Sequence, residues 1–339
     1  MKKTIVNYII VCCLYTACTK DIFSTKAEEI KPTNPNIEYI GRWDKRDTNA
    51  YISHWGGAYF RLYFTGSSAN IKLTAITSLK IYLDNQPGYL QNDKKEIVLG
   101  GLATGSHALT VAANFQSDEI GLYRVKLDDT ARLLPLPPKK QLLEFVGNSV
   151  TSGSGEHNSQ ASFAWLLGEK MGYDHTQIAF GGITLVDGYN NHNNLPHGQA
   201  TAYFELKEPS APNNSRFNFN DYTPAMIVIE LGTNDGASHV PIDKFEKTYI
   251  NFIKNIRLKY PDTKIVLLSY TSCSNYGAAQ TQHVVELYNN AGDKKIYFIS
   301  TDKWLAVADD TVDGCHPNAS GNKKLADSLQ PRLTDILNR

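Results

Sequence analysis

The chain has 339 residues, which is enough for two domains and a substantial buried core. Its 34 Lys and Arg residues balance 34 Asp and Glu residues, so the formal net charge is zero. This balance argues against a nucleic-acid-binding protein, because such proteins normally present a strongly basic face.

The amino terminus has the pattern of an export signal. Lys2 and Lys3 precede an apolar run over residues 5–14, which is too short for an ordinary membrane-spanning helix. The small residues that lead into Cys18 resemble the lipobox of bacterial lipoproteins, in which that cysteine becomes lipidated. We therefore predict a signal peptide over residues 1–17 and an exported protein that is lipid-anchored to the bacterial cell envelope. A conventional signal peptide with cleavage nearby is the alternative.

The next segments predict a tether followed by an all-β domain. Residues 18–36 are polar and contain two prolines, which suits a tether. Short β-rich segments with turn signals between them then predict a β-sandwich or jelly roll over residues 37–134. We expect Trp43 and Trp55 in its core. The predicted strands cover residues 51–55, 58–64, 70–76, 79–83, 95–99, 105–112 and 120–127.

Residues 133–140 contain three prolines and predict a stiff connector, with the catalytic domain at 135–339. Beyond them, strands alternate with helices, which is typical of a parallel sheet flanked by helices. The polar segment 187–222 is interpreted as an insertion that walls a substrate groove. The predicted strands are 141–146, 177–180, 225–231, 264–270 and 295–299, and the predicted helices are 159–171, 242–260, 278–291 and 319–337.

Polar residues follow the ends of these strands and could form one catalytic site. Ser149 comes two residues after the apolar run that ends at Gly147, and Asn234 follows a second such run. Asp313 and His316 stand just before the last helix. A serine nucleophile needs a base, and the base needs an orienting acceptor. The oxyanion of the intermediate needs preorganised N–H donors.

The motifs Gly147-Asn148-Ser149, Gly182, Gly232-Thr233-Asn234-Asp235 and Asp313-x-x-His316-Pro317 resemble, in this order, the blocks of the SGNH hydrolases. The preceding β domain, with Gly41-Arg42-Trp43 near its start, is similar to that of the two-domain family-two carbohydrate esterases. The resemblance implies an α/β fold in which a β-sandwich (jelly-roll) domain precedes a flavodoxin-like parallel sheet.

The resemblance also implies a role for each matching residue. Ser149 would be the nucleophile, His316 the general base and Asp313 the residue that orients the base. The oxyanion hole would consist of the Ser149 and Gly182 N–H groups and the Asn234 side chain. Gly181 is an alternative to Gly182, and a Ser–His dyad without Asp313 is an alternative to the triad. Asn148 departs from the family pattern, which usually has aspartate before the nucleophile.

The resemblance therefore implies a serine esterase that removes O-acetyl groups from a polysaccharide. A glycan-binding lipoprotein with a degenerate core and a lipase or thioesterase on the same core are the alternatives. We expect the acetylated polysaccharide or oligosaccharide as the partner, the membrane only through the lipid anchor, and no nucleic acid. No cofactor is expected, and no metal site, because no cluster has zinc-ligand spacing.

Two groups of residues remain outside this scheme. Cys273 and Cys315 either form a disulfide, as an exported protein allows, or stay as separate buried thiols. The other histidines lack a catalytic context, and we expect them at the surface or in loops. They include His157, His175, His192, His197, His239 and His283.

Overall fold

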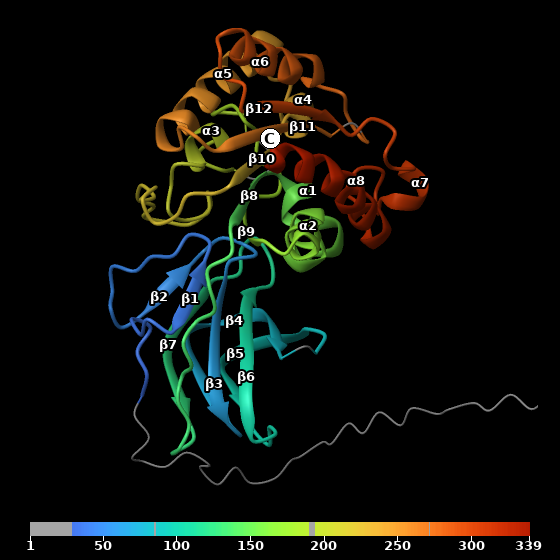
Figure 1. Cartoon of the computed structure of the whole chain (residues 1–339). Coiled ribbons are helices and arrows are strands. Elements are labelled where there is room, and N and C mark those ends of the chain that lie inside the picture. The colour runs from blue at the N-terminus through green and yellow to red at the C-terminus, as the bar shows by residue number, and fades with distance from the viewer. Residues whose placement is uncertain (1–28, 85, 190–193, 271) are drawn as a thin grey trace, which may run out of the picture.

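The computed structural model describes residues 29–84, 86–189, 194–270 and 272–339, which form a β domain and an α/β domain (Figure 1). The predicted signal peptide, the lipid site at Cys18, the first part of the predicted tether and His192 lie outside the described residues, and what was expected of them stays a prediction. Within the described residues, no helix is long and apolar enough to cross a membrane.

In the described part of the chain, a seven-stranded antiparallel sheet makes up the β domain. The strands are β1 (Ile37–Ile40), β2 (Tyr51–Ser53), β3 (Tyr59–Gly66), β4 (Ala69–Leu83), β5 (Tyr89–Leu99), β6 (Gly105–Ala113) and β7 (Ile120–Leu127). Their order is β1-β3-β6-β4-β7-β2, with β5 paired to β4.

The long strand β4 gives the β domain its curvature. Residues 69–73 pair with β7, whereas residues 79–83 pair with β6, so the sheet bends around one apolar core as a half barrel. The predicted all-β domain is confirmed. Two of the predicted strands are the two halves of β4, and β1 was not predicted.

A parallel sheet forms the centre of the α/β domain. Its strands in the described residues are β8 (Leu142–Gly147), β9 (Asp174–Ala179), β10 (Met226–Glu230), β11 (Lys264–Ser269) and β12 (Ile296–Ser300). Their order is β12-β11-β10-β8-β9, the flavodoxin-like order that the resemblance implies. Strands β8, β10 and β11 are almost entirely buried, which explains why they read as continuous apolar runs.

Helices cover both faces of this sheet (Figure 1). Helices α2 (Phe163–Met171) and α8 (Ala319–Asn338) pack on one face, and α5 (Ile242–Lys259) and α6 (Ala278–Asn290) pack on the other. These four helices match the predictions to within a few residues. The shorter ones are α1 (Ser149–Ser152), η1 (Ser154–Glu156), η2 (Ser159–Ala161), α3 (Gln199–Ala202), α4 (Thr233–Ala237) and α7 (Val307–Asp310).

Two predictions about single residues are wrong. Trp43 lies in the β-domain core as expected, but Trp55 packs in the core of the α/β domain. Its indole N–H donates to the Leu206 carbonyl at 3.0 Å, because the loop after β2 reaches across the domain boundary. His175, expected at the surface, is fully buried in β9, where its ring meets Trp165 edge-on at 4.5 Å.

Part of the polar segment 187–222 lies at the interface between the two domains. Tyr203 and Tyr222 donate hydrogen bonds from their hydroxyls to the buried carboxylate of Glu144, at 2.6 Å and 2.5 Å. Because Glu144 lies on β8 near the β domain, this part of segment 187–222 covers the contact between the domains. That the segment also walls a substrate groove stays a prediction.

Candidate active site

The predicted site residues converge at the carboxyl edge of the parallel sheet. Ser149 begins α1 directly after β8, and Asn234 lies in α4 directly after β10. These two strands are neighbours at the point where the strand order reverses, which is where open α/β sheets place their ligands. Gly182 follows β9, and Asp313 and His316 lie between α7 and α8.

Serine, histidine and aspartate form one hydrogen-bonded line. The Nε2 atom of His316 lies 2.8 Å from the Ser149 Oγ, and its Nδ1 lies 2.6 Å from Asp313 Oδ2. This geometry places a base within reach of the hydroxyl proton and an acceptor behind the base. Ser149 is half-buried and the His316 side chain is 29% exposed, so a substrate can reach both residues.

Asp313 is held as a carboxylate by its own loop. Burial alone would raise its pKa, but the His316 side chain and the backbone N–H groups of His316 and Cys315 outweigh this effect and hold the pKa at about 2. The two backbone bonds reach Asp313 Oδ1 at 2.8 Å and 3.0 Å, which leaves Oδ2 for the imidazole. The carboxylate is therefore ionised wherever an esterase would work, and it favours the Nδ1–H tautomer of His316.

Asn148 anchors the nucleophile turn with both ends of its amide. Its Oδ1 accepts from the Val150 N–H at 2.9 Å and caps α1, while its Nδ2 donates to Glu230 Oε1 at 3.2 Å. Thr151 donates its hydroxyl to Glu230 Oε2 at 3.3 Å. Burial raises the pKa of Glu230 to about 7 against these hydrogen bonds. Glu230 was not predicted from the sequence, although its place before Gly232-Thr233-Asn234-Asp235 could have suggested a contact between β8 and β10.

The loop after β9 distinguishes between the two glycines considered for the oxyanion hole. The Gly181 N–H donates to Gln116 Oε1 at 2.6 Å, so it is engaged. The Gly182 N–H donates to no described residue, and Gly182 has a φ of 76°, which glycine adopts without strain. Asn234 donates from Nδ2 to the Ile183 carbonyl at 2.9 Å and retains its second N–H. This arrangement favours Gly182 over Gly181.

Asp235 holds the segment after β9 through backbone hydrogen bonds. Its carboxylate accepts from the Leu185 N–H at 2.9 Å and the Val186 N–H at 3.1 Å. Burial raises the pKa of Asp235 to about 7. Together with the bond between Asn234 and Ile183, these contacts tie the end of β10 to the segment that carries Gly182.

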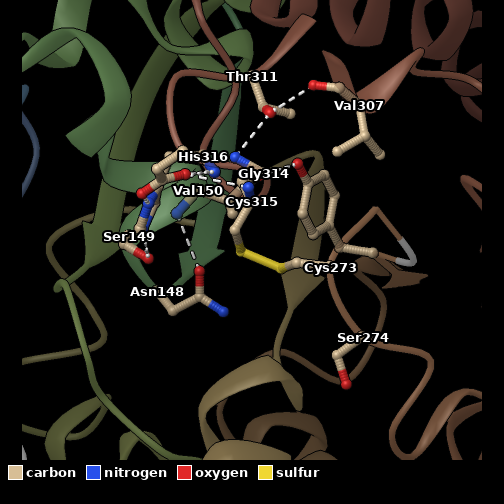
Figure 2. The surroundings of a disulfide bond; sticks show 12 residues. Asn148, Ser149, Val150, Cys273, Ser274, Val307, Thr311, Gly314, Cys315 and His316 are labelled. Atoms are coloured by element: carbon tan, nitrogen blue, oxygen red, sulfur yellow. Dashed lines mark hydrogen bonds and ion pairs between the residues drawn. A yellow bond between two sulfur atoms is a disulfide. The ribbon is translucent and has the colours of Figure 1, made fainter.

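A disulfide joins Cys273 to Cys315 beside the catalytic line (Figure 2), which answers the question that the sequence left open. Cys315 directly precedes His316, and its carbonyl accepts from the Tyr270 hydroxyl at 2.5 Å. The disulfide therefore links the loop after β11 to the loop that carries His316. The described residues contain no group of three or more His, Cys, Asp or Glu side chains placed to hold a metal ion.

With this geometry in place, comparison with known proteins identifies the family. The family model described as "GDSL-like Lipase/Acylhydrolase family" matches residues 145–324, which is more than half of the chain, so the chain belongs to this family. A second family model, "Carbohydrate esterase 2 N-terminal", matches residues 39–137. The chain therefore has the two-domain architecture of the family-two carbohydrate esterases.

Its relatives are esterases. The cellulase/esterase CelE of Acetivibrio thermocellus is 27% identical over 90% of this chain, and the chain spans 40% of that relative's length. The acetylxylan esterase/glucomannan deacetylase of Cellvibrio japonicus is 24% identical over 84% of this chain and 85% of its own length. The enzyme class predicted from the sequence, a carboxylic ester hydrolase, is the class to which these relatives belong.

Solved structures agree on the fold. A family-two carbohydrate esterase from Clostridium thermocellum in complex with cellohexaose has a TM-score of 0.78, 24% identity and coverage of 89% of this chain and 99% of its own. The family-two esterase of Cellvibrio japonicus also has a TM-score of 0.78, at 18% identity, with 92% and 98% of the two chains covered. These similarities extend across both domains.

Proposed function

We propose that the protein is a serine esterase that removes O-acetyl groups from a polysaccharide. The observation that carries the proposal is the 2.8 Å contact between His316 Nε2 and Ser149 Oγ, with Asp313 directly behind the imidazole. A serine hydroxyl is a weak nucleophile unless a base takes its proton, and the contact supplies that base. The names of two relatives, an acetylxylan esterase/glucomannan deacetylase and a cellulase/esterase, support an acetylated glycan as substrate.

In the proposed reaction, Ser149 Oγ bonds to the acetyl carbonyl carbon while its proton passes to His316 Nε2. An electron pair of the carbonyl moves onto its oxygen. The Ser149 N–H, the Gly182 N–H and Asn234 Nδ2 donate hydrogen bonds to the resulting oxyanion. The intermediate then expels the sugar oxygen, which takes the proton from His316. A water molecule then gives a proton to His316 and bonds to the acyl carbon. The bond between this carbon and Ser149 Oγ breaks, acetate leaves, and Ser149 Oγ takes the proton back from His316.

The test is acetate release from acetylated xylan and acetylated glucomannan by the full chain and by Ser149→Ala. We expect the variant to lose about 10³-fold or more of the rate, because the residual rate after loss of a nucleophile comes from binding and the oxyanion hole alone. Ser274→Ala is the matched control, since this serine follows Cys273, accepts the Tyr276 N–H at 3.1 Å and lies apart from Ser149 and His316 (Figure 2). Undiminished release by Ser149→Ala would refute the assignment of the nucleophile.

Two further measurements separate the rival functions. A chain that binds glycan but fails to hydrolyse an activated aryl acetate would be a binding protein with a degenerate core. A chain that prefers long acyl chains over acetate on aryl esters would be a lipase or thioesterase. The proposal requires hydrolysis of the aryl acetate and a preference for the acetyl group.

A further inference from the structure

A loop of the β domain lies against the candidate oxyanion loop. Residues 114–119 connect β6 to β7, and Gln116 in this loop accepts the Gly181 N–H at 2.6 Å through its Oε1. Only the oxygen end of the amide can accept, so the bond fixes the orientation of the side chain. This contact crosses the boundary between the two domains.

The glycine at position 181 lets the Gln116 amide approach the backbone closely. A Cβ at this position would lie 3.1 Å from both Nε2 and Oε1 of Gln116, closer than an ordinary contact. On the other side, a Cβ on Gly56 would lie 2.6 Å from the Gln116 Cα. Gln116 thus lies close to two glycines, one from each domain, and the approach to Gly56 is too close for a Cβ at that position.

The loop that carries Gln116 is itself held in place. The Phe115 N–H donates to Asp118 Oδ2 at 2.9 Å, which closes the turn. The Asn114 carbonyl accepts from the Ser159 N–H at 2.8 Å, and the Ala113 carbonyl accepts from Gln160 Nε2 at 2.7 Å. Gln116 therefore approaches Gly181 from a support that is anchored on the catalytic domain.

We infer that Gln116 is a positioning residue for the oxyanion hole, supplied by the β domain. Gly181 and Gly182 are adjacent, so the peptide that Gln116 orients is directly linked to the one whose N–H is left for the oxyanion. Without the acceptor, two glycines in sequence have wide conformational freedom, and the Gly182 N–H loses its fixed direction. The N–H donors of an oxyanion hole must be preorganised to act, so a Gly182 N–H without a fixed direction stabilises the transition state less. The inference rests on the proposed function.

The test compares Gln116→Met with the wild-type full chain on an aryl acetate. Methionine keeps the length of the side chain and removes the acceptor. We expect kcat to fall about 10-fold to 100-fold, somewhat less than for outright deletion of an oxyanion donor, while KM changes little. Affinity for a trifluoromethyl ketone analogue, which forms a tetrahedral adduct with the serine, should fall in parallel with kcat.

Gln160→Met is the matched control. It removes the other glutamine bond between the domains, from Nε2 to the Ala113 carbonyl, and leaves Gly181 untouched. We expect a lower melting temperature and a much smaller loss of kcat than in Gln116→Met, because the bond from the Ser159 N–H to the Asn114 carbonyl still holds the loop. Gln116→Asn is a second variant, because it keeps an amide that is one methylene too short to reach Gly181, and it should reproduce the loss in kcat.

The outcomes separate this inference from the proposed function. A wild-type chain that hydrolyses aryl acetate through Ser149, together with Gln116 variants of wild-type kcat, would overturn the role of Gln116 alone. That role would also be overturned if Gln160→Met lost as much kcat as Gln116→Met, since the effect would then be one of domain docking. A wild-type chain without any Ser149-dependent hydrolysis would refute both.

Discussion

Asn148 is the residue at which this chain departs from the expected motif, and its contacts give a physical reason for the departure. Its amide accepts at one end from Val150 and donates at the other to the buried Glu230. A carboxylate at position 148 could serve as the helix cap but could not donate. The asparagine is therefore matched to the glutamate on the neighbouring strand and gives no sign of a degenerate site.

Asn148→Asp is expected to place two carboxyl groups about as close as the amide and Glu230 are now. Two such groups cannot both ionise, so they share a proton. A raised carboxyl pKa stabilises the fold at low pH, and this contribution is lost as pH rises through the pKa, which is already about 7 for Glu230 beside asparagine. We expect the variant to match the wild type near pH 5 and to lose about 2 kcal/mol of unfolding free energy by pH 8.

The double variant Asn148→Asp/Glu230→Gln provides the control. The glutamine amide can donate to the new aspartate, so the original polarity of the pair is reversed and its hydrogen bond is retained. Melting temperature and kcat, measured from pH 5 to pH 9, should return toward the wild-type profile. A double variant that is as pH-sensitive as the single variant would show that Glu230 is not the partner that matters.

At the scale of elements, the helices and strands that long residue patterns specify could be predicted from the sequence. The apolar face of α5 and the buried runs of β8 and β10 could be recognised because many residues repeat the same signal. The short elements could not be predicted. Helices such as α1 and α4 are too short to be stable alone and form because tertiary contacts hold them. Ser149 and Asn234 both lie in such helices, so the local structure of the candidate site could not be predicted, although the sequence motifs pointed to both residues.

The disulfide is the covalent link between two elements of the site. It closes a loop of 42 residues and joins the segment after β11 to the segment that carries His316. Loss of the bond should lower the unfolding free energy by up to about 4 kcal/mol, the chain-entropy value for a loop of this size. Because Cys315 is adjacent to His316, greater freedom in this loop should also lower kcat.

The measurement is melting temperature and kcat for Cys273→Ala/Cys315→Ala, with and without a thiol reductant. The reductant should bring the wild type to the values of the double variant and should leave the variant itself unchanged. Equal melting temperatures for the wild type and the double variant would contradict a structural role for this bond.

At the scale of the molecule, the contacts that the sequence could not predict are those between the domains. Trp55 and Gln116 both belong to the β-domain segment of the sequence, yet one packs in the α/β core and the other touches the oxyanion loop. Neither residue belongs to a periodic pattern in the sequence, because each makes a single contact across the boundary between the domains. The resemblance that drew attention to Arg42 gave no role for it, and the structure supplies one.

Arg42 is fully buried at the domain interface and should stabilise it. Its guanidinium lies 3.8 Å from Glu144 on β8, donates to the Glu205 carbonyl at 2.8 Å, and lies over the rings of Tyr203 and Phe217. Removing one partner of a buried ion pair leaves the other charge uncompensated. We expect Arg42→Met to lower the unfolding free energy by about 3 kcal/mol or more, and to lower kcat because Gln116 depends on the same docking.

Chemical denaturation followed by tryptophan fluorescence tests this expectation, since Trp55 lies beside the guanidinium at 5.8 Å. Arg46→Ala is the matched control from the same stretch of chain, because the Arg46 side chain is 66% exposed and pairs only with Asp44 in the described residues. Its denaturation midpoint should stay that of the wild type, as is usual for surface ion pairs. If Arg42→Met unfolds at the midpoint of Arg46→Ala, the contacts of Arg42 do not stabilise the interface, and this expectation is wrong.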